Sequence, residues 1–181
     1  YLKQGKVLFE GSWMSRTRRE QELQKRLDAD EAAIKGAREE QKWQNRKELS
    51  TRHFDITSNC TQDVLDEYAD LMEAYYKYFT DFWNIRLSAK DAKRRMKFFL
   101  YRNSADFYSI TGMQRGVLGF FQPTTGELHL FDMFEDREYA QDVMFHEGNH
   151  LLTHLIDTGY LYPPWMNEGM AEYYGSAEID E

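Results

Sequence analysis

Residues 143–155 read VMFHEGNHLLTHL, and their pattern predicts a helix that extends over residues 136–157. Two residues four apart on a helix lie one turn above each other on the same face. His146 and His150 have this spacing, so their imidazoles can hold a single cation between them. Glu147 faces the same side without being a ligand, close enough to polarise a water on the metal. The simpler interpretation, that both histidines are ordinary core residues, needs no metal.

A zinc ion held by two histidines needs a third protein ligand and keeps one position open for water. His154 is four residues beyond His150, but a further turn lies about 6 Å along the axis, too far to close around one tetrahedral ion. Glu168 follows in a predicted helix over residues 163–174. Gly159 and two prolines permit the chain to reverse, so that the second helix can present Glu168 to the first. We therefore favour Glu168 over His154, for which a place beside the ligands or in the core is expected.

Glu172 lies one helical turn after Glu168 and shares its face. A carboxylate there can accept the Nδ1–H of a ligand histidine, which fixes the tautomer of that histidine and raises its basicity. For both glutamates the alternative is a solvated position on an exposed helix. Tyr173 and Tyr174 are the nearby phenols that could stabilise a transition state, with packing as their alternative role.

The stretch HEGNH at 146–150, followed by WMNEGMAEYY at 165–174, resembles the gluzincin metallopeptidases, which include thermolysin-like and M1-aminopeptidase-like enzymes. In that group an HExxH helix pairs with a downstream Asn-Glu helix. The order of strand, long helix, strand and hairpin before the motif is also similar to uncharacterised bacterial peptidase MA-like domains. The specific similarity covers residues 139–175, and a looser likeness of architecture covers residues 50–175.

This resemblance implies an α+β fold: a gluzincin-like catalytic core with a small mixed sheet, an HExxH active-site helix and a following Glu-ligand helix. It implies that His146, His150 and Glu168 bind Zn²⁺ and that Glu147 is the general base. Glu172 would be the acid that supports a ligand histidine.

The resemblance further implies an edge strand that lines the cleft and pairs with an extended peptide, and the hairpin at 116–131 is the candidate for it.

Two features of the family have no counterpart in this sequence. Gluzincins continue into a helical subdomain that supplies a Tyr or His for the oxyanion, whereas this chain ends at Glu181. We therefore expect a domain that is truncated at its C-terminus. A Gly-rich exopeptidase motif does not precede the HExxH helix, so exopeptidase specificity is not implied.

Composition restricts the alternatives. The chain has 23 Lys and Arg against 31 Asp and Glu, a net charge of −8, so we expect no nucleic-acid partner. The single cysteine, Cys60, rules out an internal disulfide and a thiolate cluster, which restricts a metal to histidines and carboxylates. No stretch approaches the roughly 20 apolar residues of a membrane span. The chain begins at Tyr1 without a leader, which we interpret as a trimmed piece, and a secreted or periplasmic location is compatible with it.

We expect two parts. Residues 1–49 would form an N-terminal strand followed by a long charged helix over residues 16–49, which has ten Lys and Arg, eight Asp and Glu and a thin apolar stripe. This arm is either solvated or a binding site for a protein partner. Residues 50–181 would form the metallopeptidase-like zinc-binding domain. Its further predicted elements are strands at 52–57 and 96–101, a helix from Val64 to Phe82, a helix at 104–109 capped by Ser104, and hairpin strands at 117–122 and 127–131.

The residues and the resemblance together predict a zinc-dependent peptidase that acts on a peptide or protein substrate, with Glu147 as the general base. The alternative is a zinc-containing but non-hydrolytic binding or assembly domain, although a purely structural site has no use for Glu147. Two histidines and one carboxylate could also hold iron for oxygen chemistry, but the spare glutamate fits hydrolysis better.

Overall fold

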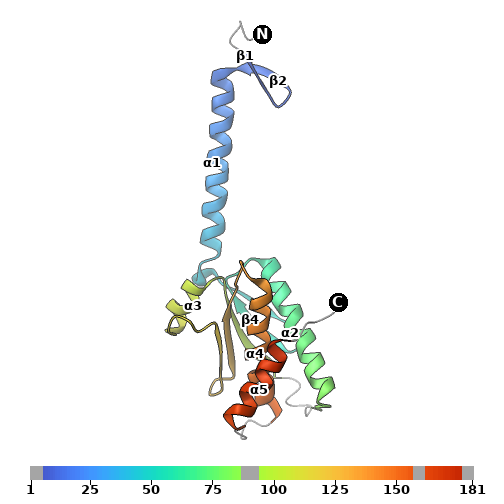
Figure 1. The fold of residues 1–181 in the computed structure, drawn as a ribbon. Helices are drawn as coiled ribbons and strands as arrows, with labels where there is room; N and C mark the ends of the chain where they lie inside the picture. The colour runs from blue at the N-terminus through green and yellow to red at the C-terminus, as the bar shows by residue number, and fades with distance from the viewer. Residues whose placement is uncertain (1–5, 87–93, 157–161, 177–181) are drawn as a thin grey trace. The chain divides into compact units, whose positions relative to one another are not determined.

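The computed structural model of the chain describes residues 6–86, 94–156 and 162–176 (Figure 1). The chain forms two compact units, one up to Glu40 and the other from Gln41 onward.

The first unit holds a hairpin of β1 (Lys6–Phe9) and β2 (Ser12–Ser15), followed by α1 (Arg16–Glu40). The hairpin turn has positive φ at both central residues, 47° at Glu10 and 79° at Gly11, as a tight turn between twisted strands requires. Arg26 of α1 donates two hydrogen bonds to the Glu10 carboxylate, at 2.6 and 2.7 Å. None of the α1 residues is buried, so this helix is exposed along its length within its own unit.

The prediction of one helix over residues 16–49 is wrong in its second part, because α1 ends at Glu40. The following residues form a short 3-10 helix, η2 (Trp43–Asn45), and the strand β3 (Lys47–Ser50). The second unit therefore includes this strand and starts before the expected boundary at residue 50.

Apolar side chains explain the early end of α1. Leu49 of β3 packs against the main core of the second unit, and Trp43 stacks on Tyr101 with 4.6 Å between ring centroids. A helix whose stability depends on burying one apolar face gains nothing from an exposed continuation. Packing Trp43 and Leu49 against the sheet domain removes apolar surface from water, which stabilises the fold more than a longer exposed helix would.

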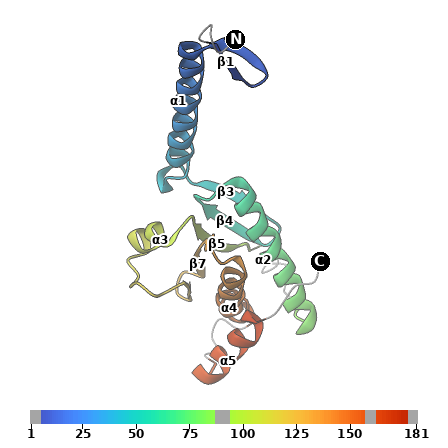
Figure 2. The same cartoon turned by 45° about the horizontal axis from the view of Figure 1, so that its top comes forward.

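A mixed sheet forms the centre of the second unit, with its described strands in the order β3-β4-β5-β7-β6 (Figure 2). The central strands β4 (Phe54–Ser58), β5 (Met96–Tyr101) and β7 (Glu127–Phe131) are parallel. β3 and β6 (Gly119–Gln122) pair antiparallel at the two edges. The expectation of an α+β fold with a small mixed sheet is confirmed.

The helices α2 (Gln62–Phe82) and α4 (Arg137–Ile156) form the main core with one face of this sheet. Alternate strand residues such as Phe98 and Leu100 point into that core and are fully buried. The helices close over them with apolar faces, which explains why the three- and four-residue spacing predicted α2 correctly.

The opposite face of the sheet packs against α3 (Ser104–Thr111), whose Phe107 is buried with Tyr101 and Phe131. Ser104 is not the cap of this helix, contrary to the prediction. Asn103 has extended backbone, and its side chain accepts a hydrogen bond from the Asp106 N–H at 2.9 Å. An N-cap needs such a non-helical residue with a short polar side chain, and Asn103 precedes the first helical residue.

The helix α5 (Pro164–Gly175) packs along α4 (Figure 1). Pro164 occupies the first turn, where its missing N–H costs no hydrogen bond. A Cβ at Gly175 would lie 3.2 Å from the Asp142 carbonyl oxygen and 3.4 Å from the His146 Cβ. The glycine therefore permits the close approach of the two helices. Gly159, which was expected to break the chain between them, lies outside the described residues.

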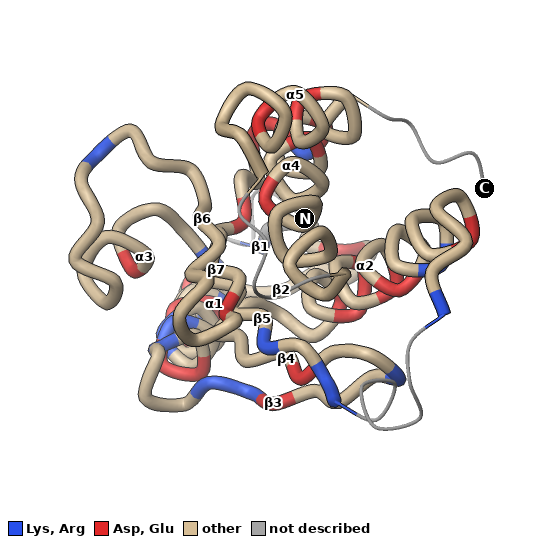
Figure 3. The backbone as a smooth tube through the Cα atoms, turned by 90° about the horizontal axis from the view of Figure 1, so that it is seen from below, with Lys and Arg blue, Asp and Glu red and all other residues tan. Residues whose placement is uncertain are grey.

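Acidic residues recur along α2, α4 and α5, whereas β3 and β5 each carry a lysine, Lys47 and Lys97 (Figure 3). Within the described ranges, none of the helices combines the length and the apolar character needed to cross a bilayer.

Candidate metal centre

The central part of α4 carries the two histidines of the HExxH motif. Their ring centroids are 5.1 Å apart, and the side chains of His146 and His150 are 21% and 13% exposed. On the other side of the helix Phe145 and Leu152 are buried in the main core. This packing fixes the helix and leaves the two imidazoles at the surface of the core, partly exposed.

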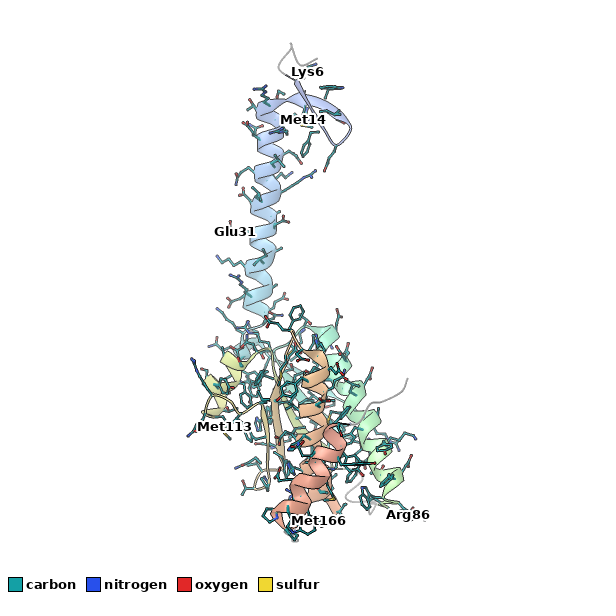
Figure 4. All side chains as sticks on the ribbon, viewed as in Figure 1. Lys6, Met14, Glu31, Arg86, Met113 and Met166 are labelled. Carbon is teal, nitrogen blue, oxygen red and sulfur yellow. The ribbon has the colours of Figure 1, made fainter. Side chains whose placement is uncertain are left out.

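The helix α5 brings a carboxylate to these imidazoles. Oε2 of Glu168 lies 3.5 Å from Nε2 of His146 and 3.7 Å from Nε2 of His150. Met166, labelled in Figure 4, lies two residues before Glu168 on the same helix. One potential ligand atom from each of the three residues lies within 4.8 Å of the other two.

These three residues have the donor types that zinc binds, and the two distances from Glu168 to the histidines are near those of a tetrahedral site. Zinc accepts imidazole nitrogens and carboxylate oxygens at about 2.0–2.2 Å, so two ligand atoms of a tetrahedral site lie about 3.3–3.5 Å apart. The measured distances from Glu168 Oε2 to the two histidine nitrogens are close to that value. The set also leaves a fourth position without a protein ligand, which distinguishes catalytic from closed structural sites.

The two histidines differ in what their other ring nitrogen contacts. Nδ1 of His146 lies 3.6 Å from Oε1 of Glu172, an ion-pair distance to an exposed carboxylate. Nδ1 of His150 is buried and has no hydrogen-bond partner among the described residues. Glu172 therefore approaches His146 and not His150, at a distance longer than the expected hydrogen bond.

The structure does not bring the remaining predicted residues to this cluster. His154 lies on α4 beyond the cluster, with its ring 5.4 Å from that of Phe121. Tyr174 is buried, and its hydroxyl accepts a hydrogen bond from Trp83 Nε1 at 2.8 Å. Tyr173 is 65% exposed. Neither tyrosine lines the two cavities that border the histidines.

Glu147 is held at the edge of the sheet. Its Oε2 accepts a hydrogen bond from the backbone N–H of Phe121 in β6 at 3.1 Å. Burial raises the pKa of Glu147 above its ordinary value, while His150, His146 and the Phe121 N–H oppose that shift. A carboxyl group with a raised pKa in this position is suited to accepting and returning a proton.

Gly119 explains how β6 comes so close to α4. A Cβ at this position would lie 3.1 Å from the His129 carbonyl oxygen and 3.2 Å from Cγ of Glu147. Those contacts are tighter than ordinary packing, so only glycine fits without movement of the strand or the helix.

Two cavities border the cluster, and both are lined in part by His146 and Glu147. One, of about 440 Å³, lies toward the start of β6 and the end of α5. The other, of about 400 Å³, lies toward the end of β6 and the start of α5. The cluster therefore has a cavity toward each end of β6.

Sequence reasoning missed Gly119, the Phe121 backbone amide and Asp142, which lines the larger cavity. The hydrogen bond from the Phe121 backbone N–H to Glu147 does not depend on the side chain at position 121, so the residue type does not predict it. A glycine directly before two phenylalanines in a strand was the available signal, because glycine inside a strand often marks close approach of another element.

No known protein family matches the chain, and neither a curated protein nor a solved structure is significantly similar to it. The comparisons therefore do not test the resemblance to gluzincins, which is based on the sequence motifs alone.

Proposed function

We propose that this chain is a zinc-dependent peptidase that hydrolyses peptide bonds with Glu147 as the general base. The observation that carries the proposal is the convergence of His146, His150 and Glu168 from two helices, with ligand atoms within 4.8 Å of one another. The Glu147 carboxylate, borne by the residue next to His146, supplies the group that a purely structural site would not need.

Each residue has a defined part in this reaction. His146, His150 and Glu168 would hold the ion. Bound zinc would supply Lewis acidity toward a water molecule and toward the scissile carbonyl, lowering the pKa of the water to about 7. Glu147 accepts the proton of the attacking water at a carboxylate oxygen and then delivers it to the leaving nitrogen as the carbon–nitrogen bond breaks.

The edge of the sheet offers a place for the substrate backbone. β6 pairs with β7 on one side, and its other side faces α4 without a further described strand. An extended peptide can add to such an edge through main-chain hydrogen bonds. That arrangement would bring a peptide bond past Glu147, which already contacts the β6 backbone.

A panel of quenched fluorogenic peptides tests this function. We expect the full chain, loaded with zinc, to cleave members of the panel, and we expect a chelator to stop cleavage. Glu147→Gln retains the shape of the side chain but cannot accept the proton, so this variant should bind zinc and lose hydrolysis. Equal turnover by Glu147→Gln and wild type would disprove the assignment. Bound zinc without cleavage of a broad panel would favour the non-hydrolytic binding domain.

A further inference from the structure

The larger cavity beside the cluster combines apolar walls with carboxylates. It has a volume of about 440 Å³ and lies between the segment leading into β6, the first half of α4 and the end of α5. The side chains that give it this character are Val117, Leu118, Tyr139, Asp142, Val143 and Glu172.

The carboxylates of this cavity have no Lys or Arg partner among the described residues. Asp142 precedes His146 by one turn of α4, so both residues lie on the same side of the helix. Among the described residues, no Lys or Arg forms an ion pair with Asp142 or Glu172. Burial raises the pKa of Asp142 above its ordinary value, and the nearby Glu138 and Asp136 raise it further.

The second cavity differs in chemistry. Its walls include Phe120, Phe121 and Pro123, together with neutral polar side chains such as Asn167. Among the described residues that line it, the carboxylates are Glu147 and Glu168, which the proposed centre already uses. In the part of the chain that the structure describes, carboxylates other than Glu147 and Glu168 therefore line the larger of the two cavities and not the second.

We propose that the larger cavity receives the side chain of a lysine or arginine residue next to the scissile bond, an inference that rests on the proposed peptidase function. The apolar walls fit the aliphatic stem of such a side chain, and the carboxylates of Asp142 and Glu172 pair with its cationic end. A free α-amino group has the same charge but lacks the stem that Val117, Leu118 and Val143 would contact.

Binding to the zinc-loaded full chain with the substitution Glu147→Gln tests this inference without hydrolysis. The ligands are N-acetylated, C-amidated peptides with either lysine or norleucine at one position, which is moved along the peptide. At one position we expect the lysine peptide to bind about tenfold more tightly, the scale of a partly solvated charge-assisted contact. A further substitution, Asp142→Asn, should remove that difference and leave the affinity for the norleucine peptide unchanged.

Two controls separate a local contact from general attraction to an acidic protein. Asp70→Asn removes the same charge from an exposed position on α2 and should preserve the lysine preference. Glu172→Gln should weaken the preference and provides a second test if Asp142→Asn does not fold. Equal affinity for lysine and norleucine at every position, or a preference that survives in Asp142→Asn, would overturn the inference.

A third arm identifies the source of the positive charge. Peptides with a free N-terminus and no lysine should bind no more tightly than their acetylated forms. A gain that comes from the free terminus alone would assign the cavity to the α-amino group and contradict the proposal.

Cleavage of the same peptides by the zinc-loaded wild type distinguishes this inference from the proposed function. Equal cleavage of lysine and norleucine peptides would refute the preference while supporting the peptidase. Lysine-dependent binding without cleavage of any peptide would refute the peptidase and support the cationic ligand of the cavity.

Discussion

The backbone amide of Phe121 in β6 donates a hydrogen bond to the carboxylate of Glu147 in α4, with 3.1 Å between nitrogen and oxygen. This bond joins the edge strand to the residue proposed as the general base. It fixes the carboxylate in the position from which, in the proposed reaction, Glu147 would accept a proton from a water molecule at the histidine cluster. Residues that set the distance between β6 and α4 should therefore affect turnover more than they affect metal binding.

Gly119→Ala should disturb this relationship. The added Cβ would lie within 3.2 Å of Glu147 Cγ and of the β7 backbone, so the strand or the helix has to shift. We expect a loss of about 1–3 kcal/mol in the free energy of unfolding. We also expect kcat to fall about 10- to 100-fold as the base is displaced, with zinc binding retained. Gly36→Ala, in the exposed α1 where a Cβ meets no atom within 4 Å, is the matched control and should leave kcat unchanged. Wild-type kcat in folded Gly119→Ala would show that the close approach has no part in catalysis.

The two candidates for the third ligand can be separated by zinc affinity. Glu168→Ala removes a carboxylate whose oxygen lies 3.5 Å from His146 Nε2. We expect zinc affinity to fall by more than the roughly 10- to 100-fold that the loss of a residue behind the ligands costs. His154→Ala should leave zinc affinity within a few-fold of wild type. Competition with a chromogenic chelator measures both values, and a larger loss in His154→Ala would reverse the assignment.

Substitutions of the two tyrosines of α5 should have different effects on the free energy of unfolding, and neither should change kcat. Tyr174→Phe removes the acceptor of the Trp83 Nε1–H bond in a packed aromatic cluster. We expect a loss of about 1 kcal/mol in the free energy of unfolding from this change. Tyr173→Phe alters an exposed side chain and should be neutral. Denaturant titration measures the stabilities. A large fall in kcat for either variant, with stability unchanged, would instead indicate a phenol that acts in the transition state.

A pH-dependent contribution to stability is expected from Glu73, which is not part of the cluster. The Glu73 carboxylate accepts hydrogen bonds from the Thr51 hydroxyl at 2.6 Å and the His53 backbone N–H at 2.8 Å, and it lies 2.6 Å from His53 Nδ1. Burial raises the pKa of Glu73, but the hydrogen bonds from Thr51 and His53 outweigh that effect and hold the pKa below its ordinary value. Since the folded-state pKa is lowered, this stabilisation is present above the unfolded pKa of about 4.3 and is lost as the pH falls through the folded value.

Glu73→Gln should therefore cost about 1–3 kcal/mol at pH 7, and the difference from wild type should shrink as the pH is lowered below about 4. Unfolding in urea across this range measures the difference. Asp70→Asn, at an exposed position of the same helix, should show little effect at either pH. A difference between wild type and Glu73→Gln that grows toward acid would contradict the direction of the pKa shift.

The sequence predicted correctly the helices and strands that bury one face, because the spacing of their apolar residues follows from that burial. The strand at 96–101 and the helix ending at Phe82 match the structure because alternate or three-to-four-residue spacing follows directly from packing against the sheet. The end of α1 at Glu40 was missed because Trp43 and Leu49 are isolated apolar residues in a charged stretch. Their partners, Tyr101 and the main core, lie far away in the chain, so local pattern carries no sign of them.

In the candidate site, too, the features set by local spacing could be predicted, and those set by packing between distant segments could not. The spacing of His146 and His150 is local, and a helix alone places them on one face. The approach of Glu168 depends on how α5 packs on α4, and the glycine at 175 that allows it became meaningful only once its neighbours were known. The contact between Phe121 and Glu147 involves a backbone group and could not be read from residue types.

Metal analysis of the purified full chain tests the central claim most directly. The account predicts about one zinc per chain in the wild type and in Glu147→Gln, and none in a variant that carries both His146→Ala and His150→Ala. A wild-type protein that contains no zinc and takes none up at micromolar concentration would contradict it.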